Sequence, residues 1–251
     1  MAKNKSLLSF LMALAVCQFV LPVLATPTTH IWAPSTDVQP FARWHITADV
    51  YVPVEKNPAG RNISPVTNLG LTVGVLPDDK FQMEIGFDHK AGLETLDNSP
   101  FYFNLKAGIP DKTFGNYSPA VAVGIFDVGT EGDRTNNNVL YVKLAKSFVL
   151  NNFDIGRFSL GYFRGNPKLL LDKAGHPDNK GFLVAWERTL KEVSDKLWVC
   201  VEYMGSSSSY GSLNFGFSWK FSNSTSLLIG YNIYSNSDLP RTLTVQTDID
   251  F

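Results

Sequence analysis

The chain has 251 residues, of which 44% are hydrophobic, 13% aromatic and 18% charged. This composition can form one sizeable domain and excludes a disordered tail. The formal net charge of −1 argues against a nucleic-acid partner, because proteins that bind phosphate backbones carry an excess of Lys and Arg.

The first 25 residues have the pattern of a cleaved signal peptide. Early lysines precede an apolar stretch over residues 7–20, and the small residue Ala25 suits cleavage before Thr26. An uncleaved membrane anchor is the alternative, but Gln18 and Pro22 interrupt the apolar segment.

Cleavage leaves 251 − 25 = 226 residues and 20 basic against 23 acidic side chains, a net charge of −3. Cys200 then has no partner for an intrachain disulfide, so an exported chain must gain stability elsewhere. No stretch after Ala25 reaches the roughly 20 apolar residues that a spanning helix needs. A membrane location would therefore require strands.

Period-two alternation of apolar and polar residues runs through most of the remaining chain. It is clearest in residues 80–88, where Phe81, Met83, Ile85 and Phe87 alternate with polar residues and glycine. We expect about twelve strands, an even number as in bacterial barrels. They cover residues 43–52, 68–75, 80–88, 101–109, 119–128, 139–149, 154–164, 181–190, 197–204, 213–220, 227–234 and 242–251.

Two of these segments have an ambiguous facing, residues 119–128 and 154–164. If Val121, Val123 and Ile125 face lipid, Asp127 falls on the lipid side near a rim. The connections are clearer: short links alternate with long ones rich in Gly, Asn, Asp and Lys, the asymmetry of periplasmic turns and outer loops. Residues 110–117 are an exception, a long link on the short side.

The C-terminus resembles the terminal signature of bacterial outer-membrane proteins, with alternate apolar positions and a final aromatic residue: Val245, Thr247, Ile249 and Phe251. The resemblance implies an insertion signal read by the barrel assembly machinery, and a transmembrane antiparallel up-and-down β-barrel in the bacterial outer membrane. It identifies no subfamily.

The expected organisation is a signal peptide at 1–25, a periplasmic N-terminal lead-in at 26–42 and the barrel at 43–251. The distinctive segment His30–Pro40 falls in the lead-in, with Ser35 and Asp37 in turns. We attach no function to this segment.

A soluble exported sandwich or lipocalin-like barrel is the alternative fold, because its strands also alternate. The faces opposite the apolar rows, however, carry too many ionisable groups for one dry core. They fit the lumen of a membrane barrel. The candidate lumen-lining residues are Arg43, His45, Asp49, Lys80, Glu84, Lys106, Glu202, Lys220, Asp248 and Asp250.

Two ion-pair clusters follow from the expected register. Pairing Phe87 with Phe103 brings Glu84 opposite Lys106 on the lumen side. Closure of the barrel pairs the first strand with the last, so Arg43 and His45 meet Asp248 and Asp250 at the periplasmic mouth. A carboxylate beside His45 favours the imidazolium form. The cluster is interpreted as a structural clamp or as a selectivity constriction.

No sequence motif of an enzyme is present: neither a Gly-x-Ser-x-Gly elbow nor a His-Glu-x-x-His helix occurs. We expect no catalytic residues, metal or cofactor. The expected role is porin-like passage of small hydrophilic solutes; a barrel enzyme acting on outer-membrane lipid and a structural or adhesive barrel are the alternatives. The expected partners are outer-membrane lipid, the assembly machinery and small polar solutes.

The signal peptide and terminal strand predict that the mature protein begins near Thr26, fractionates with the outer membrane and migrates anomalously on gels unless boiled. N-terminal sequencing, fractionation and a heat-modifiability gel measure these properties. Recovery as a soluble periplasmic protein beginning at Thr26 would contradict the membrane assignment.

Overall fold

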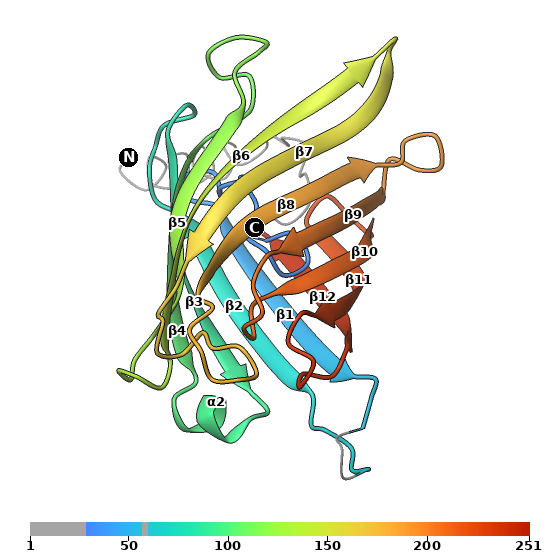
Figure 1. Cartoon of the computed structure of the whole chain (residues 1–251). Helices are drawn as coiled ribbons and strands as arrows, with labels where there is room; N and C mark the ends of the chain where they lie inside the picture. The colour runs from blue at the N-terminus through green and yellow to red at the C-terminus, as the bar shows by residue number, and fades with distance from the viewer. Residues whose placement is uncertain (1–28, 57–59) are drawn as a thin grey trace, which may run out of the picture.

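The computed structural model describes residues 29–56 and 60–251. Twelve antiparallel strands form a closed barrel in which each strand pairs with its sequence neighbours and β1 pairs with β12 (Figure 1). The strands are β1 (Trp44–Pro53), β2 (Val66–Gly74), β3 (Gln82–Ala91), β4 (Phe101–Ile109), β5 (Ala120–Gly129), β6 (Asn136–Leu150), β7 (Phe153–Arg164), β8 (Lys180–Thr189), β9 (Leu197–Met204), β10 (Ser212–Lys220), β11 (Thr225–Tyr234) and β12 (Thr242–Asp250). The predicted fold and strand number are confirmed.

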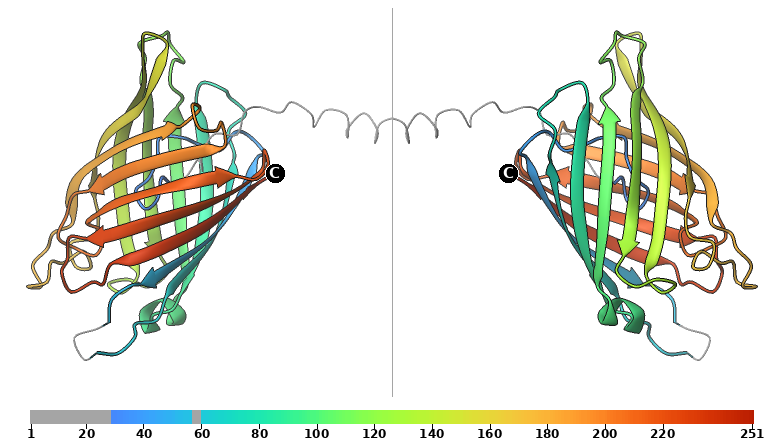
Figure 2. Two further views of the ribbon diagram at one scale, coloured as in Figure 1. Left: turned by 90° about the vertical axis from the view of Figure 1, so that its right-hand side faces the viewer. Right: turned by 90° about the vertical axis from the view of Figure 1, so that its left-hand side faces the viewer.

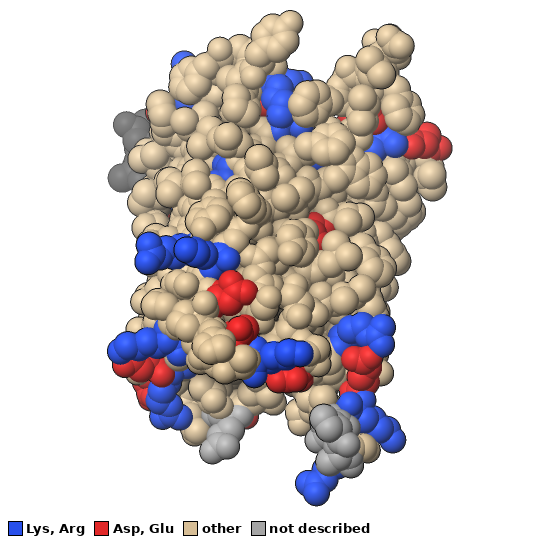
Figure 3. All heavy atoms as spheres, viewed as in Figure 1, with Lys and Arg blue, Asp and Glu red and all other residues tan. Residues whose placement is uncertain are grey.

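The alternating sequence pattern separates an apolar exterior from a polar interior. Along β10, Leu213, Phe215 and Phe217 are exposed on the outside, while Asn214 and Ser218 are buried inside. Figure 3 shows that charged side chains gather mainly toward the end of the barrel where α2 (Glu94–Asn98) lies, and that the middle of this face is largely uncharged. Such an apolar band fits contact with lipid.

β5 contains a bulge that the alternation does not predict. The register with β6 shifts between Phe126 and Val128, and Asp127 has a positive φ of 55°. The extra residue turns Asp127 inward, where it is buried, while Val123 remains exposed outside. The facing of Asp127, which the sequence leaves ambiguous, is therefore inward, because a bulge reverses the facing of the residues beyond it.

The long link between β4 and β5 is held by one side chain from β6. Lys146 Nζ lies 2.9 Å from Asp111 Oδ1 and donates to the carbonyls of Asn116 and Ser118 at 2.7 and 3.1 Å. Burial by itself would raise the pKa of Asp111, but the hydrogen bonds from Lys146 and Ser147 outweigh it and lower that pKa. The long β4–β5 link is thus fixed to the barrel wall by the ammonium group of Lys146.

We call residues 29–42 the lumen segment. Residues 29–40 lie inside the barrel rather than in the expected periplasmic lead-in, and Phe41 and Ala42 are exposed at its end. His30, Ile31 and Ala33 are at most 2% exposed. Both views of Figure 2 show the blue segment crossing the interior behind the strands. Ser35 Oγ accepts a hydrogen bond from the Asp37 N–H, so the expected local turn is present within it. The predicted signal peptide lies outside the described residues.

The seam between β1 and β12 has the part of the predicted ion-pair cluster that involves His45. His45 pairs in register with Asp250; its Nδ1 lies 2.9 Å from Asp250 Oδ1 and its Nε2 lies 3.4 Å from Asp248 Oδ1. Arg43 precedes β1 and is exposed. Gln39 of the lumen segment also donates to Asp250 Oδ1 at 3.0 Å. The imidazole therefore joins both carboxylates across the closing strand pair.

Replacing the seam carboxylates together, Asp248→Asn with Asp250→Asn, should slow folding and destabilise the barrel by about 2 kcal/mol, because charge-assisted hydrogen bonds to His45 are lost. The gel shift during refolding into lipid vesicles and urea unfolding measure the two effects. The matched control, Asp195→Asn with Asp238→Asn, removes the same charge from exposed loops. Normal folding in the seam variant would contradict the clamp; if ion selectivity changed instead, the cluster would be a constriction.

Candidate functional site

The interior of the barrel is divided into two sides. The lumen segment contacts charged and polar residues mainly of β6–β9 and β12, including Lys143, Glu187 and Glu202. It also contacts Glu84 of β3 and Lys106 of β4. Beside it, a cavity of about 150 Å³ is lined largely by β1–β5. This cavity and the contacts that hold the segment are the candidate site.

Glu202 on β9 is the centre of the contacts with the lumen segment. Its carboxylate accepts hydrogen bonds from the backbone N–H groups of Ile31, Trp32 and Ala33 at 3.5, 2.6 and 3.1 Å. Asn214 donates to the same carboxylate at 2.9 Å. Because Glu202 is only 1% exposed, these donors replace the water that an ionised carboxylate would otherwise need.

Four further side chains of the wall bind the backbone of the lumen segment. Together with Glu202 they form what we call the seat: Glu84, Lys106, Lys143, Glu202 and Gln246. Glu84 accepts from the Gln39 N–H at 2.6 Å, and Lys106 donates to the Asp37 carbonyl at 2.7 Å. Lys143 donates to the Pro34 carbonyl at 2.8 Å and Gln246 to the Ile31 carbonyl at 2.7 Å.

Side-chain contacts add to these backbone contacts. His30 Nε2 lies 3.2 Å from Glu187 Oε1, and Arg157 binds Asp37 Oδ1 at 2.7 Å and also the Thr36 hydroxyl. The ring of Trp32 packs against three tyrosines, with centroid distances of 5.3 Å to Tyr51, 6.2 Å to Tyr210 and 6.1 Å to Tyr234. The segment is thus anchored by ion pairs and by an aromatic cluster.

Glycines of the wall make room for the apolar side chains of the lumen segment. A Cβ at Gly230 would lie 2.9 Å from Ile31 Cγ2, and one at Gly108 would lie 2.8 Å from Val38 Cγ2. The sequence indicates that these glycines leave space for water or long side chains. In the structure that space holds the protein's own N-terminal residues.

One polar side chain from each of five consecutive strands forms a chain of hydrogen bonds around the other half of the wall. We call it the acidic belt: Asp49, Asn68, Asp88, Asn104 and Asp127. Asn68 Nδ2 donates to Asp49 and to Asp88 at 3.2 and 3.1 Å. Asn104 Nδ2 donates to Asp88 at 2.5 Å, and its Oδ1 accepts from the Asp127 N–H at 3.1 Å.

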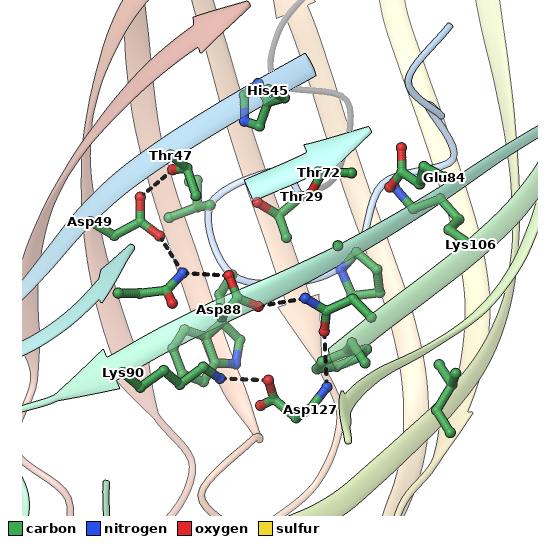
Figure 4. A pocket seen from close by; sticks show the side chains of 18 of the residues that line it. Thr29, His45, Thr47, Asp49, Thr72, Glu84, Asp88, Lys90, Lys106 and Asp127 are labelled. Atoms are coloured by element: carbon green, nitrogen blue, oxygen red, sulfur yellow. Dashed lines mark hydrogen bonds and ion pairs between the residues drawn. The ribbon is translucent and has the colours of Figure 1, made fainter. Parts of the chain in front are cut away.

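The belt carries more negative than positive charge. Lys90 Nζ lies 2.5 Å from Asp127 Oδ1, so that carboxylate has a cation beside it. Asp49 accepts from Thr47 and Asn68, and Asp88 from Asn68 and Asn104, all neutral donors. Figure 4 shows the labelled members of the belt along one side of the cavity, with Glu84 and Lys106 together at another. The wall therefore favours positive charge near Asp49 and Asp88.

The loop between β7 and β8 covers the outer end of the lumen on the β6–β9 side, across from the acidic belt. Leu170 from this loop is fully buried and packs in one apolar cluster with Phe163, Leu183 and Met204. Ala33 of the lumen segment belongs to the same cluster. Apolar packing thus fills the β6–β9 side, whereas the β1–β5 side keeps a polar cavity.

The predicted ion pair between Glu84 and Lys106 is confirmed: the residues are in register and their charged atoms are 3.0 Å apart. Seven of the ten candidate lumen residues lie in the seat, the acidic belt or the seam; Arg43, Lys80 and Lys220 do not. Glu84, Lys106 and Glu202 belong to the seat, Asp49 to the belt, and His45, Asp248 and Asp250 to the seam. Lys80 precedes β3 and is exposed, and Lys220 ends β10 half-buried. Val245, Thr247, Ile249 and Phe251 follow the outward face to the chain end, and their role in insertion stays a prediction.

Several residues that bind the lumen segment are not among those predicted from the sequence, notably Lys143, Arg157 and Glu187. Each lies on the inward register of a strand in the less regular middle of the chain. Among the described residues, no group of His, Cys, Asp and Glu is arranged to hold a metal ion, and no helix is long and apolar enough to span a membrane.

A closed antiparallel barrel of twelve strands with an apolar exterior has the fold of bacterial outer-membrane β-barrel proteins, and it agrees with the predicted outer-membrane location. No family model and no curated protein matches the sequence. Solved porins are similar in fold. A KdgM porin in complex with disordered oligogalacturonate is 11% identical with a TM-score of 0.51, and the match covers 83% of this chain and 99% of that one.

Two other solved structures are more distant. A NanC porin is 10% identical with a TM-score of 0.49, covering 82% of this chain and 98% of that one. Outer membrane phospholipase A from Escherichia coli is 13% identical with a TM-score of 0.45, covering 83% and 92%. At such identities only the fold is shared.

Lys106→Met should destabilise the barrel by about 3 kcal/mol, because it leaves the buried Glu84 carboxylate without its cation. The double variant with Glu84→Gln should be more stable than Lys106→Met, since no unpaired charge remains. Urea unfolding followed by tryptophan fluorescence measures both. Lys168→Met is the matched control: Lys168 pairs with Asp133 on the surface, so its loss should change stability by less than about 0.5 kcal/mol. Equal stability of the single and double variants would contradict a paired buried charge.

Proposed function

We propose that this protein is a porin-like barrel that allows small hydrophilic solutes to cross the outer membrane, along the side of the lumen lined by β1–β5. The observation that carries the proposal is the polar cavity that remains beside the lumen segment. Its lining reaches from the seam residues His45 and Asp248, at the periplasmic mouth, to Lys90 and Asp127 in the outer half. Polar groups at both levels suit a hydrated path.

The size of the cavity limits what passes. A volume of about 150 Å³ has room for several water molecules. Hydrated small ions and small polar solutes fit this space, and larger solutes do not.

The charge of the lining favours cations. Glu84, Asp127 and Asp248 each have a basic side chain within 3.4 Å, in Lys106, Lys90 and His45. The carboxylates of Asp49 and Asp88 are bound by neutral donors. Two carboxylates without a directly bound cation, on a wall of low dielectric, attract cations and repel anions.

The cation preference can be measured in planar lipid bilayers under a KCl gradient at pH 8. The wild-type barrel should conduct with a preference for K⁺ over Cl⁻, and Asp49→Asn with Asp88→Asn should lower this permeability ratio by about threefold or more, because both uncompensated carboxylates are removed.

Asp133→Asn with Asp238→Asn provides the control, since it removes two carboxylates from exposed positions outside the cavity. Absence of conductance from the folded wild-type barrel would refute passage. Conductance with an unchanged permeability ratio in the belt variant would assign selectivity to other residues and refute the role of the belt.

A further inference from the structure

The seat recognises the course of a peptide backbone. Its five side chains bind four N–H groups, those of residues 31, 32, 33 and 39, and three carbonyls, those of residues 31, 34 and 37. Carboxylates accept from N–H groups, and an amide and two ammonium groups donate to carbonyls. Such contacts select a bent chain at this place, because three consecutive N–H groups meet one carboxylate and the His30 N–H donates to the Ala33 carbonyl at 2.9 Å. The partners of Trp32 and Asp37 add preference for particular side chains.

The lumen segment is held without being part of the sheet. Within the described residues, its one strand-type pairing with the barrel is an isolated bridge between Phe41 and Gly74 at the periplasmic end. The bridge between Thr29 and Pro34 is internal to the segment. Every strand of the barrel keeps both of its neighbours without the segment, so withdrawing it opens no sheet edge.

The wall also keeps most of its charges paired when the segment is absent. The Glu84 and Lys106 pair, at 3.0 Å, and the Arg157 and Glu187 pair, at 3.5 Å, are formed between barrel residues alone. Trp198 donates to Glu187 at 3.0 Å, and Asn214 donates to Glu202 at 2.9 Å. Water entering the lumen can solvate what remains, which lowers the cost of release relative to a dry core.

From these observations we infer that the seat is a binding site for a peptide that bends at residues 30–33, and that the lumen segment occupies it as a releasable ligand of the barrel. The bound state leaves only the small cavity on the β1–β5 side. The released state widens the lumen to solutes that the cavity excludes, a consequence that rests on the proposed function. The binding itself does not depend on passage.

Cys200 provides a probe for release in the full chain. It is 1% exposed and lies in one buried cluster with Ile31, Trp198 and Leu228, so the lumen segment covers it from the inside. With Cys17→Ser, Cys200 is the sole cysteine. A small water-soluble cationic methanethiosulfonate can then reach its thiol only when the segment has left.

We expect slow labelling of Cys200 in this otherwise wild-type barrel and labelling at least about tenfold faster in Glu202→Ala, which removes three backbone contacts. Glu202→Gln, which keeps an acceptor, should give an intermediate rate. A synthetic peptide of residues 29–40, added in excess to Glu202→Ala, should slow labelling again by reoccupying the seat. Glu192→Ala, an exposed change outside the seat, should match the parent.

Equal labelling rates in all variants, or no protection by the peptide in a folded Glu202→Ala barrel, would overturn the inference. If Glu202→Ala does not fold, hydrogen exchange of the wild-type chain decides. The N–H groups of residues 31–33 and 39 should exchange together and faster than those of β9; exchange as slow as that of β9 would make the segment a fixed part of the core. Neither measurement needs ion flow, so a non-conducting barrel leaves this inference standing, and conduction does not establish it.

Discussion

The closing pair of strands imposes the constraint on which the rest of this structure depends. Once β1 binds β12, every strand has two partners, and each side chain must point either to the exterior or to the interior. The exterior takes the apolar rows, so most ionisable residues of the strands face the interior. Inside the narrow lumen, some of these residues form ion pairs with one another, and others bind the backbone of the lumen segment.

The two halves of the wall meet this requirement differently. On one half, long basic and acidic side chains reach across the lumen to the backbone of residues 31–39, and Glu84 and Lys106 of β3 and β4 do the same from the edge of the other half. On the other, short Asp and Asn side chains bind their neighbours around the wall and stay close to it. Long side chains directed inward fill space, whereas short ones leave it open. The asymmetry between the filled side and the cavity is therefore a consequence of side-chain length as well as of charge.

Much of the fold was predictable because the barrel obeys a strict period of two. Strand number, the register of Glu84 with Lys106 and the contacts of His45 across the seam all follow from it. The facing of Asp127 could not be decided from the sequence, because a bulge shifts the period without a signal in the hydrophobic pattern. The ambiguous strand at 154–164 was settled by tertiary contacts, since the partner of Arg157 on the lumen segment is Asp37, 120 positions earlier in the chain.

The position of the lumen segment could not be predicted for a different reason. Residues 30–40 show neither helical nor strand periodicity, and their main partners bind backbone atoms, which every residue possesses. The polar residues Ser35, Thr36, Asp37 and Gln39 suited an exposed lead-in equally well. The clue in the sequence was indirect: glycines on the inward faces of several strands leave a volume that the wall itself does not fill.

The place of this segment directly before β1 has a consequence for the order of assembly. The seam joins the first strand to the last, so the barrel cannot shut until its final residues have been delivered. The residues that end up deepest in the interior belong to the part of the chain that is made and exported earliest. They cannot take their final place until the twelve strands that follow them have arrived, and they must be inside when β1 and β12 pair. Assembly of this barrel therefore requires the lumen segment to be enclosed as well as the strands to be paired.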